Sequence, residues 1–89
     1  MAPRPLHDPD YAVAVQILCE LRQERGLSQV ELANRLGVDQ SLISKIERRQ
    51  RRIDIAELRR FCAALGISLG AFSERFERAV KRAHRGAQK

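Results

Sequence analysis

Apolar residues recur every three or four positions along most of the chain, and this spacing predicts amphipathic helices. The pattern predicts five helices, over residues 9–25, 29–36, 40–48, 55–65 and 69–82. No segment alternates polar and apolar residues as a half-buried strand would. The expected fold class is therefore all-α, with five short helices joined by tight turns.

Residues that typically begin and end helices separate these segments. Each predicted helix follows a residue whose side chain can cap its first turn: Asp8, Ser28, Asp39, Asp54 and Ser68. Glu31 and Glu57 lie three residues after two of these caps, which is the spacing of a capping box. Glycines end three of the helices: Gly26, Gly37 and Gly66. Helix boundaries and hydrophobic spacing therefore agree.

The apolar stripes of the last two helices differ in what they can bury. The stripe of the fourth helix is expected to face the core: Ile55, Leu58, Phe61, Cys62 and Leu65. In the fifth helix, Phe72 can close the core of one molecule. Phe76 and Val80 extend beyond what a five-helix core needs, so they either lengthen that core or form a dimer interface. We favour a homodimer, because two-fold pairs are the commonest oligomers.

Length and composition indicate one small domain with a polyanionic partner. The 89 residues divide into an N-terminal arm (1–7), a domain (8–82) and a basic tail (83–89). Seventeen Lys and Arg against eleven Asp and Glu give a net charge of +6, which favours nucleic acid, although a generally basic surface would also account for it. No apolar run suits a signal peptide or a membrane span, so a cytoplasmic protein is expected.

No catalytic or metal-binding arrangement is evident in the sequence. Cys19 and Cys62 lie apart from each other and from any pair of histidines, which argues against a zinc site. His7 and His84 fall in the terminal segments, and no nucleophile elbow or phosphate-cradling glycine loop occurs. We therefore expect neither an enzyme nor a cofactor.

The second and third predicted helices carry the functional pattern. They must cross steeply over a short turn, which requires positive φ at Gly37 and a small residue, Ala33, where the helices approach. Ile43 and Ile46 hold the buried side of the third helix. Its other positions are polar and face away from that stripe: Gln40, Ser41, Ser44, Lys45 and Arg48.

The run Gln29-x3-Ala33-x3-Gly37-x5-Ile43-x2-Ile46-Glu47 resembles the helix-turn-helix of the Cro and lambda-repressor family, also called the xenobiotic-response-element family. The likeness extends from about Leu21 to Ile67 and implies that family's compact five-helix DNA-binding domain. It implies that Gln29 fixes the domain on a DNA phosphate, although an ordinary first-turn glutamine is the alternative.

The resemblance also assigns a base-reading face to the third helix, formed by Gln40, Ser41, Ser44 and Lys45. Glutamine pairs with adenine and lysine with guanine. Either serine can instead contact phosphate or water. The family often places an ion pair at the positions of Arg22 and Glu47, which would brace the reading helix; two unrelated surface charges are the alternative.

A basic connector, residues 48–52, follows the third helix. Its arginines are expected to contact phosphates, although a solvated charge run is the alternative: Arg48, Arg49, Arg51 and Arg52. Many family members carry glycine where this chain has Arg49. An arginine there must either adopt an unfavourable backbone conformation or extend the helix.

The function expected from the sequence is that of a sequence-specific regulator of transcription. It would bind double-stranded DNA as a homodimer and insert the third helix in the major groove of a pseudo-palindromic operator. We favour repression, with activation through contact with RNA polymerase as the alternative. An antitoxin or a restriction–modification controller with the same fold is the alternative. Contact with RNA polymerase or a toxin remains open, and no membrane partner is expected.

Overall fold

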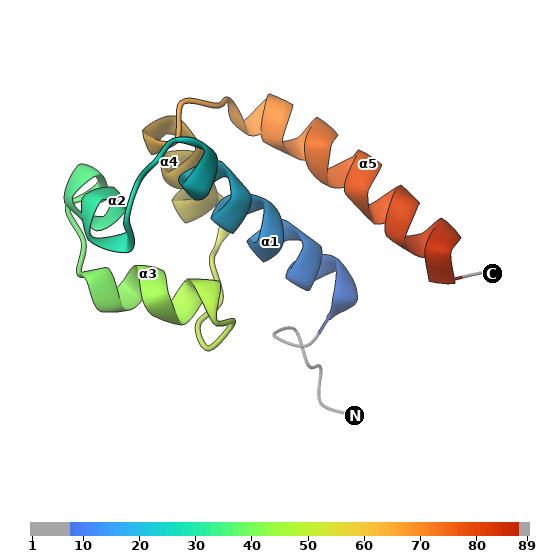
Figure 1. Cartoon of the computed structure of the whole chain (residues 1–89), viewed down its shortest axis with the longest axis horizontal. Coiled ribbons are helices and arrows are strands. Elements are labelled where there is room, and N and C mark those ends of the chain that lie inside the picture. The colour runs from blue at the N-terminus through green and yellow to red at the C-terminus, as the bar shows by residue number, and fades with distance from the viewer. Residues whose placement is uncertain (1–7, 88–89) are drawn as a thin grey trace.

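A computed structural model describes residues 8–87, which fold into five helices (Figure 1). The helices are α1 (Pro9–Glu24), α2 (Gln29–Leu36), α3 (Gln40–Glu47), α4 (Ile55–Ala64) and α5 (Leu69–Ala87). No strand occurs within these residues, so the expected all-α class is confirmed. The predicted N-terminal arm, residues 1–7, and residues 88–89 lie outside the described part.

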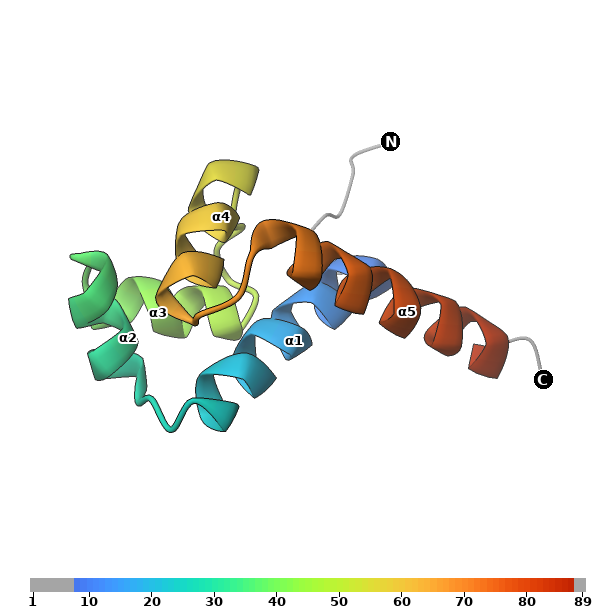
Figure 2. The ribbon, with the colours of Figure 1, turned by 90° about the horizontal axis from the view of Figure 1, so that it is seen from above.

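Helix α1 packs against both α3 and α5 and lies between them (Figure 1). The short helices α2 and α3 pack against each other, and α4 contacts both α2 and α5. In the view from above, α4 stands on the side of α5 that faces away from α1 (Figure 2). This arrangement leaves α3 along one edge of the molecule.

The core gathers side chains from all five helices, most of them at positions that the hydrophobic pattern predicts. Ile43 and Ile46 of α3 are 0% and 1% exposed, and Phe72 of α5 is 2% exposed. Phe61, Cys62 and Leu65 are buried as expected. Ile55, however, is 69% exposed, so its assignment to the core was wrong. It is the first residue of α4, and because helical side chains tilt toward the N-terminus, it projects past the packed body of the domain.

Four of the five predicted caps are present, and Asp39 is the exception. Asp8, Ser28, Asp54 and Ser68 each accept a hydrogen bond from a first-turn N–H. Asp39 has the extended backbone of an N-cap, but its carboxylate makes no capping bond. The N–H of Leu42, which a cap at this position would use, donates to the main-chain carbonyl of Asp39 instead, 3.1 Å away.

Helix α5 continues to Ala87, beyond the end at Arg82 that the sequence pattern predicts. Residues 83–87 contain no proline, and Gly86 is the one weak helix former among them. His84 Nε2 also lies 3.1 Å from Asp10 Oδ1, which links this end of α5 to the start of α1. The predicted tail is therefore helical over its first five residues.

Candidate nucleic-acid interface

A tight turn joins α2 to α3. Gly37 has φ +68°, and its N–H donates to the Asn34 carbonyl while that of Val38 donates to the Ala33 carbonyl. These two bonds close a Schellman motif, the usual way to stop a helix on a left-handed residue. A Cβ at Gly37 would meet no atom within 4 Å, so the backbone angle rather than crowding requires glycine. Ala33, 2% exposed, lies where the helices meet, as predicted.

Helix α3 presents a polar face on the surface of the domain. Gln40, Ser41 and Lys45 are exposed, whereas Ser44 is half-buried. Because Ile43 and Ile46 fix the opposite side in the core, the helix cannot turn this face away without losing its packing. Three of the four predicted reading residues are therefore exposed, and Ser44 is less so.

Arg22 of α1 and Glu47 of α3 form the predicted ion pair. The guanidinium donates from Nε to Oε2 over 2.7 Å and from Nη2 to Oε1 over 3.0 Å. Its Nη1 donates to the Leu27 carbonyl over 2.8 Å. The two side chains are only 13% and 11% exposed, and the bonds to Glu47 raise the pKa of Arg22 further above its usual range. The pair joins the last residue of α3 to the body of the domain.

A chain of side-chain hydrogen bonds extends this pair to the start of α3. Gln29 Nε2 donates to Glu47 Oε1 over 2.9 Å, and Gln40 Nε2 donates to Gln29 Oε1 over 2.7 Å. Arg22, Glu47, Gln29 and Gln40 therefore connect α1, α2 and both ends of α3. Sequence reasoning missed the two glutamine contacts, because they depend on how α2 crosses α3 and have no sequence spacing of their own.

Cys19 of α1 adds a further contact to Glu47. Burial, together with the neighbouring Glu47 carboxylate, raises the pKa of the Cys19 thiol to about 11. The thiol is therefore protonated at neutral pH beside that carboxylate.

Helix α3 ends on a left-handed arginine. Arg49 has φ +59°, and its N–H donates to the Ile46 carbonyl while that of Gln50 donates to the Lys45 carbonyl. These bonds again close a Schellman motif. Of the two outcomes expected for Arg49, the unfavourable backbone conformation is therefore the one adopted. The helix ends at Glu47, one residue earlier than predicted.

Replacing Arg49 with glycine should stabilise the fold. A left-handed L-residue costs about 1–2 kcal/mol, which glycine would not incur. Glycine loses more conformational freedom on folding than arginine does, and this offsets about 0.5–1 kcal/mol of the gain in stability. The melting temperature followed by circular dichroism should rise by about 2–6 °C. Arg48→Gly is the matched control, because Arg48 has φ −88° and should lose stability instead. Equal effects of the two changes would contradict this explanation.

The four arginines of the connector divide into two groups. Arg51 makes two bonds of 2.9 Å to the carboxylate of Glu57 and lowers the pKa of that group. Arg48, Arg49 and Arg52 are exposed and form no ion pair with any residue between 8 and 87. The latter three are therefore available to an external anion, whereas Arg51 is partly held by α4.

A shallow hollow of about 380 Å³ lies between α3 and the connector. Its polar lining comes from Asp39, Ser41, Lys45 and Arg51. Asp39, which the sequence presented only as a cap, contributes a carboxylate without a capping bond to this surface. The hollow thus combines one acidic and two basic side chains beside the polar face of α3.

Other kinds of site find no support in the described residues. Between residues 8 and 87, no three His, Cys, Asp or Glu side chains are grouped so that they could hold a metal ion. None of the five helices combines the length and apolar composition needed to span a membrane. The polar face of α3 with its connector is the candidate interface.

Comparison with known proteins identifies the family. The profile of the helix-turn-helix family matches residues 20–72, more than half of the chain. The chain belongs to the helix-turn-helix family. Its resemblance to the xenobiotic-response-element type is confirmed by an XRE-family-like protein from Pseudomonas syringae pv. tomato DC3000, which has 38% identity and a TM-score of 0.76. That match covers 80% of this chain and 87% of the Pseudomonas chain.

Two further relatives agree with this assignment. The wild-type restriction–modification controller protein C.Esp1396I shares 25% identity with a TM-score of 0.79, over 85% of this chain and 99% of that one. A hypothetical transcription factor of Neisseria meningitidis serogroup B is 36% identical over 47 residues, which are 53% of this chain. The match spans only 44% of the Neisseria protein. The family member described here is a DNA-binding regulator of transcription.

Proposed function

We propose that this helix-turn-helix protein represses transcription by inserting α3 in the major groove of a specific operator. The main support for this proposal is that α3 has a buried side, at Ile43 and Ile46, and an exposed polar side. The major groove admits one α-helix and displays a distinct pattern of donors and acceptors for each base pair. Methylation of guanine N7, which lies in that groove, should block binding at specific positions. Unimpaired binding to methylated operator would contradict the insertion of α3.

The side chain of Gln40 is oriented and has the free hydrogen-bonding groups that pairing with adenine requires. An amide nitrogen carries two N–H donors, and Gln29 takes only one of those on Gln40. The second N–H and the amide oxygen stay available for the bidentate pairing that glutamine makes with adenine N7 and N6. Gln29 thus orients a base-reading side chain, while its own backbone N–H, at the start of α2, suits a DNA phosphate.

Lys45 and Arg52 should affect DNA binding in different ways. Lys45 lies on the reading face and can donate to guanine O6 and N7, so Lys45→Ala should cost about 1–3 kcal/mol at one operator position and relax the preference there. Arg52 lies on the connector, so Arg52→Ala should weaken binding to all DNA sequences alike. It should also reduce the slope of the logarithm of the binding constant against the logarithm of the salt concentration by about one. Fluorescence anisotropy with operator variants, at several salt concentrations, measures both effects. The same effect from both changes would argue against separate roles.

We also propose that the protein acts as a homodimer through the outer face of α5. Phe76 is half-buried: it packs against the core and stacks on Phe72 with ring centroids 6.5 Å apart, so its remaining exposed edge and the half-buried Val80, which is not packed on the core, form the apolar part of this face. Apolar side chains left at the surface suit self-association. Two copies would present their α3 helices to half-sites about 34–36 Å apart, one turn of DNA.

A restriction–modification controller is the second candidate, and structural similarity favours it. C.Esp1396I has been solved as a tetramer with its natural 35 base-pair operator, and that chain matches this one at 26% identity with a TM-score of 0.77. The same α3 face would serve either role. Deleting the gene and measuring transcripts distinguishes them: a controller alters restriction and modification genes, and a general repressor alters others.

A further inference from the structure

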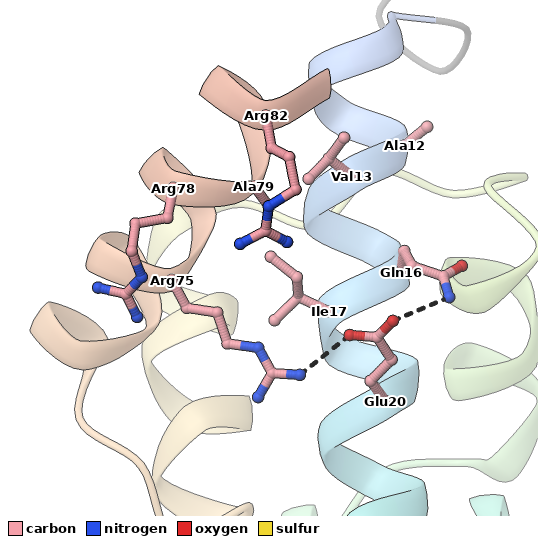
Figure 3. A pocket seen from close by; sticks show the side chains of 9 residues that line it. All are labelled: Ala12, Val13, Gln16, Ile17, Glu20, Arg75, Arg78, Ala79 and Arg82. Atoms are coloured by element: carbon pink, nitrogen blue, oxygen red, sulfur yellow. Dashed lines mark hydrogen bonds and ion pairs between the residues drawn. The ribbon is translucent and has the colours of Figure 1, made fainter. Parts of the chain in front are cut away.

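A groove of about 580 Å³ runs between α1 and α5 (Figure 3). Apolar side chains form its floor: Ile17, which is 3% exposed, and the half-buried Val13 and Ala79. Two arginines of α5 line the groove: Arg82 extends its guanidinium group toward that floor, whereas the guanidinium group of Arg78 lies on the side of α5 farther from α1 (Figure 3). The groove therefore combines an apolar surface with cationic groups along one side.

The two carboxylates at this end of the groove share one arginine, whereas two arginines on its basic side have no carboxylate partner within residues 8–87. Arg75 Nη2 lies 2.9 Å from Glu20 Oε1 and 3.1 Å from Glu24 Oε2, and Gln16 donates to the other Glu20 oxygen over 3.2 Å. Arg78 and Arg82 form no ion pair or side-chain hydrogen bond with any residue that the structure describes. Like charges four residues apart on a helix destabilise it, so a bound anion would relieve this pair.

The groove is separate from both surfaces that the proposed function uses. Helix α1 lies between it and α3 (Figure 1). On a helix of 3.6 residues per turn, Val80 points to the side of α5 away from Arg75, Arg78 and Arg82. Neither base reading nor dimerisation through Val80 therefore explains why these arginines lie along one side of an apolar floor.

We propose that this groove binds a small amphipathic organic anion. A carboxylate, sulfonate or phosphate group binds Arg78 and Arg82, whose planar guanidinium groups suit such oxygens, and the apolar body of the ligand rests on Val13, Ile17 and Ala79. The volume lies within the range of about 300–1,000 Å³ typical of small-molecule sites. The inference does not depend on the DNA-binding function.

Two fluorescent probes that share one ring system test this site on the full chain. Anilinonaphthalene sulfonate carries an anionic group, and phenylnaphthylamine lacks it. The sulfonate should bind saturably and at least about tenfold more tightly than the neutral probe, a difference of about 1.4 kcal/mol. The double variant Arg78→Gln/Arg82→Gln should weaken sulfonate binding at least about tenfold and leave the neutral probe unchanged.

A matched control separates the site from net charge. Arg59→Gln/Arg60→Gln removes two exposed arginines of α4 and should leave sulfonate binding unchanged. In amide NMR spectra, the sulfonate should shift resonances of residues 12–20 and 75–82. Equal losses in both double variants, or shifts confined to α3, would overturn the proposal. A loss of the dimer in the Arg78→Gln/Arg82→Gln variant would also overturn it, because the groove would then be an interface between two copies of the chain.

Discussion

Replacing Arg22 with alanine is expected to lower the stability of the fold and its DNA affinity together. The change leaves the Glu47 carboxylate, 11% exposed, without its cationic partner. Removing one member of a fully buried pair costs about 3–5 kcal/mol, and the remaining exposure here reduces the expected loss to about 2–3 kcal/mol. The melting temperature should fall by on the order of 10 °C. Affinity should fall as well, because Glu47 also holds Gln29, which orients Gln40.

Two further variants make the Arg22 prediction specific. Arg75→Ala breaks a more exposed pair with Glu20 and should cost less than about 1 kcal/mol. Adding Glu47→Gln to Arg22→Ala should restore part of the lost stability, because no unpaired charge then remains near the core. An unchanged melting temperature in Arg22→Ala, with thermal unfolding followed by circular dichroism, would contradict the bracing role of the pair.

Placing an aspartate at Val80 is expected to abolish the proposed dimer. A charge on the apolar face of α5 would have to lose its hydration for that face to associate. Sedimentation should show a monomer at micromolar concentration, and operator affinity should fall by at least about 100-fold, because the two half-sites are no longer bound by one linked unit. The far-UV spectrum should not change, since Val80 is only half-buried in the isolated chain.

The control for Val80→Asp adds the same charge elsewhere on α5. Ala71 is exposed on a different face of that helix, so Ala71→Asp should leave both dimer and affinity intact. Equal effects of the two aspartates would indicate general electrostatic repulsion of DNA rather than a lost interface. A wild-type protein that sediments only as a monomer would contradict the dimer itself.

The parts of the fold that the sequence predicts depend on local interactions. The capping box of Ser28 and Glu31 spans four residues, and the left-handed turn needs only Gly37. The burial of Ile43 and Ile46 follows from helical spacing. In each case a few neighbouring residues determine the structure, so the pattern is visible without knowledge of the packing.

The parts that the sequence does not predict depend on tertiary arrangement. Gln29 and Gln40 meet only because α2 crosses α3 at its observed angle, and Arg51 binds Glu57 only because the connector folds back onto α4. Ile55 has the right spacing for the core but begins its helix where the packed body ends. The Arg22–Glu47 pair could be anticipated only through resemblance to a family.

Selection of bound sequences from random double-stranded DNA, at two salt concentrations, tests the central claim most directly. The exposed face of α3 predicts one enriched pseudo-palindrome at both concentrations, with half-site centres about 34–36 Å apart. Lys45→Ala should lose the preference at one position of each half-site. Weak binding to all sequences that falls steeply with salt, and no enriched motif, would show that the net charge of +6 alone accounts for DNA binding.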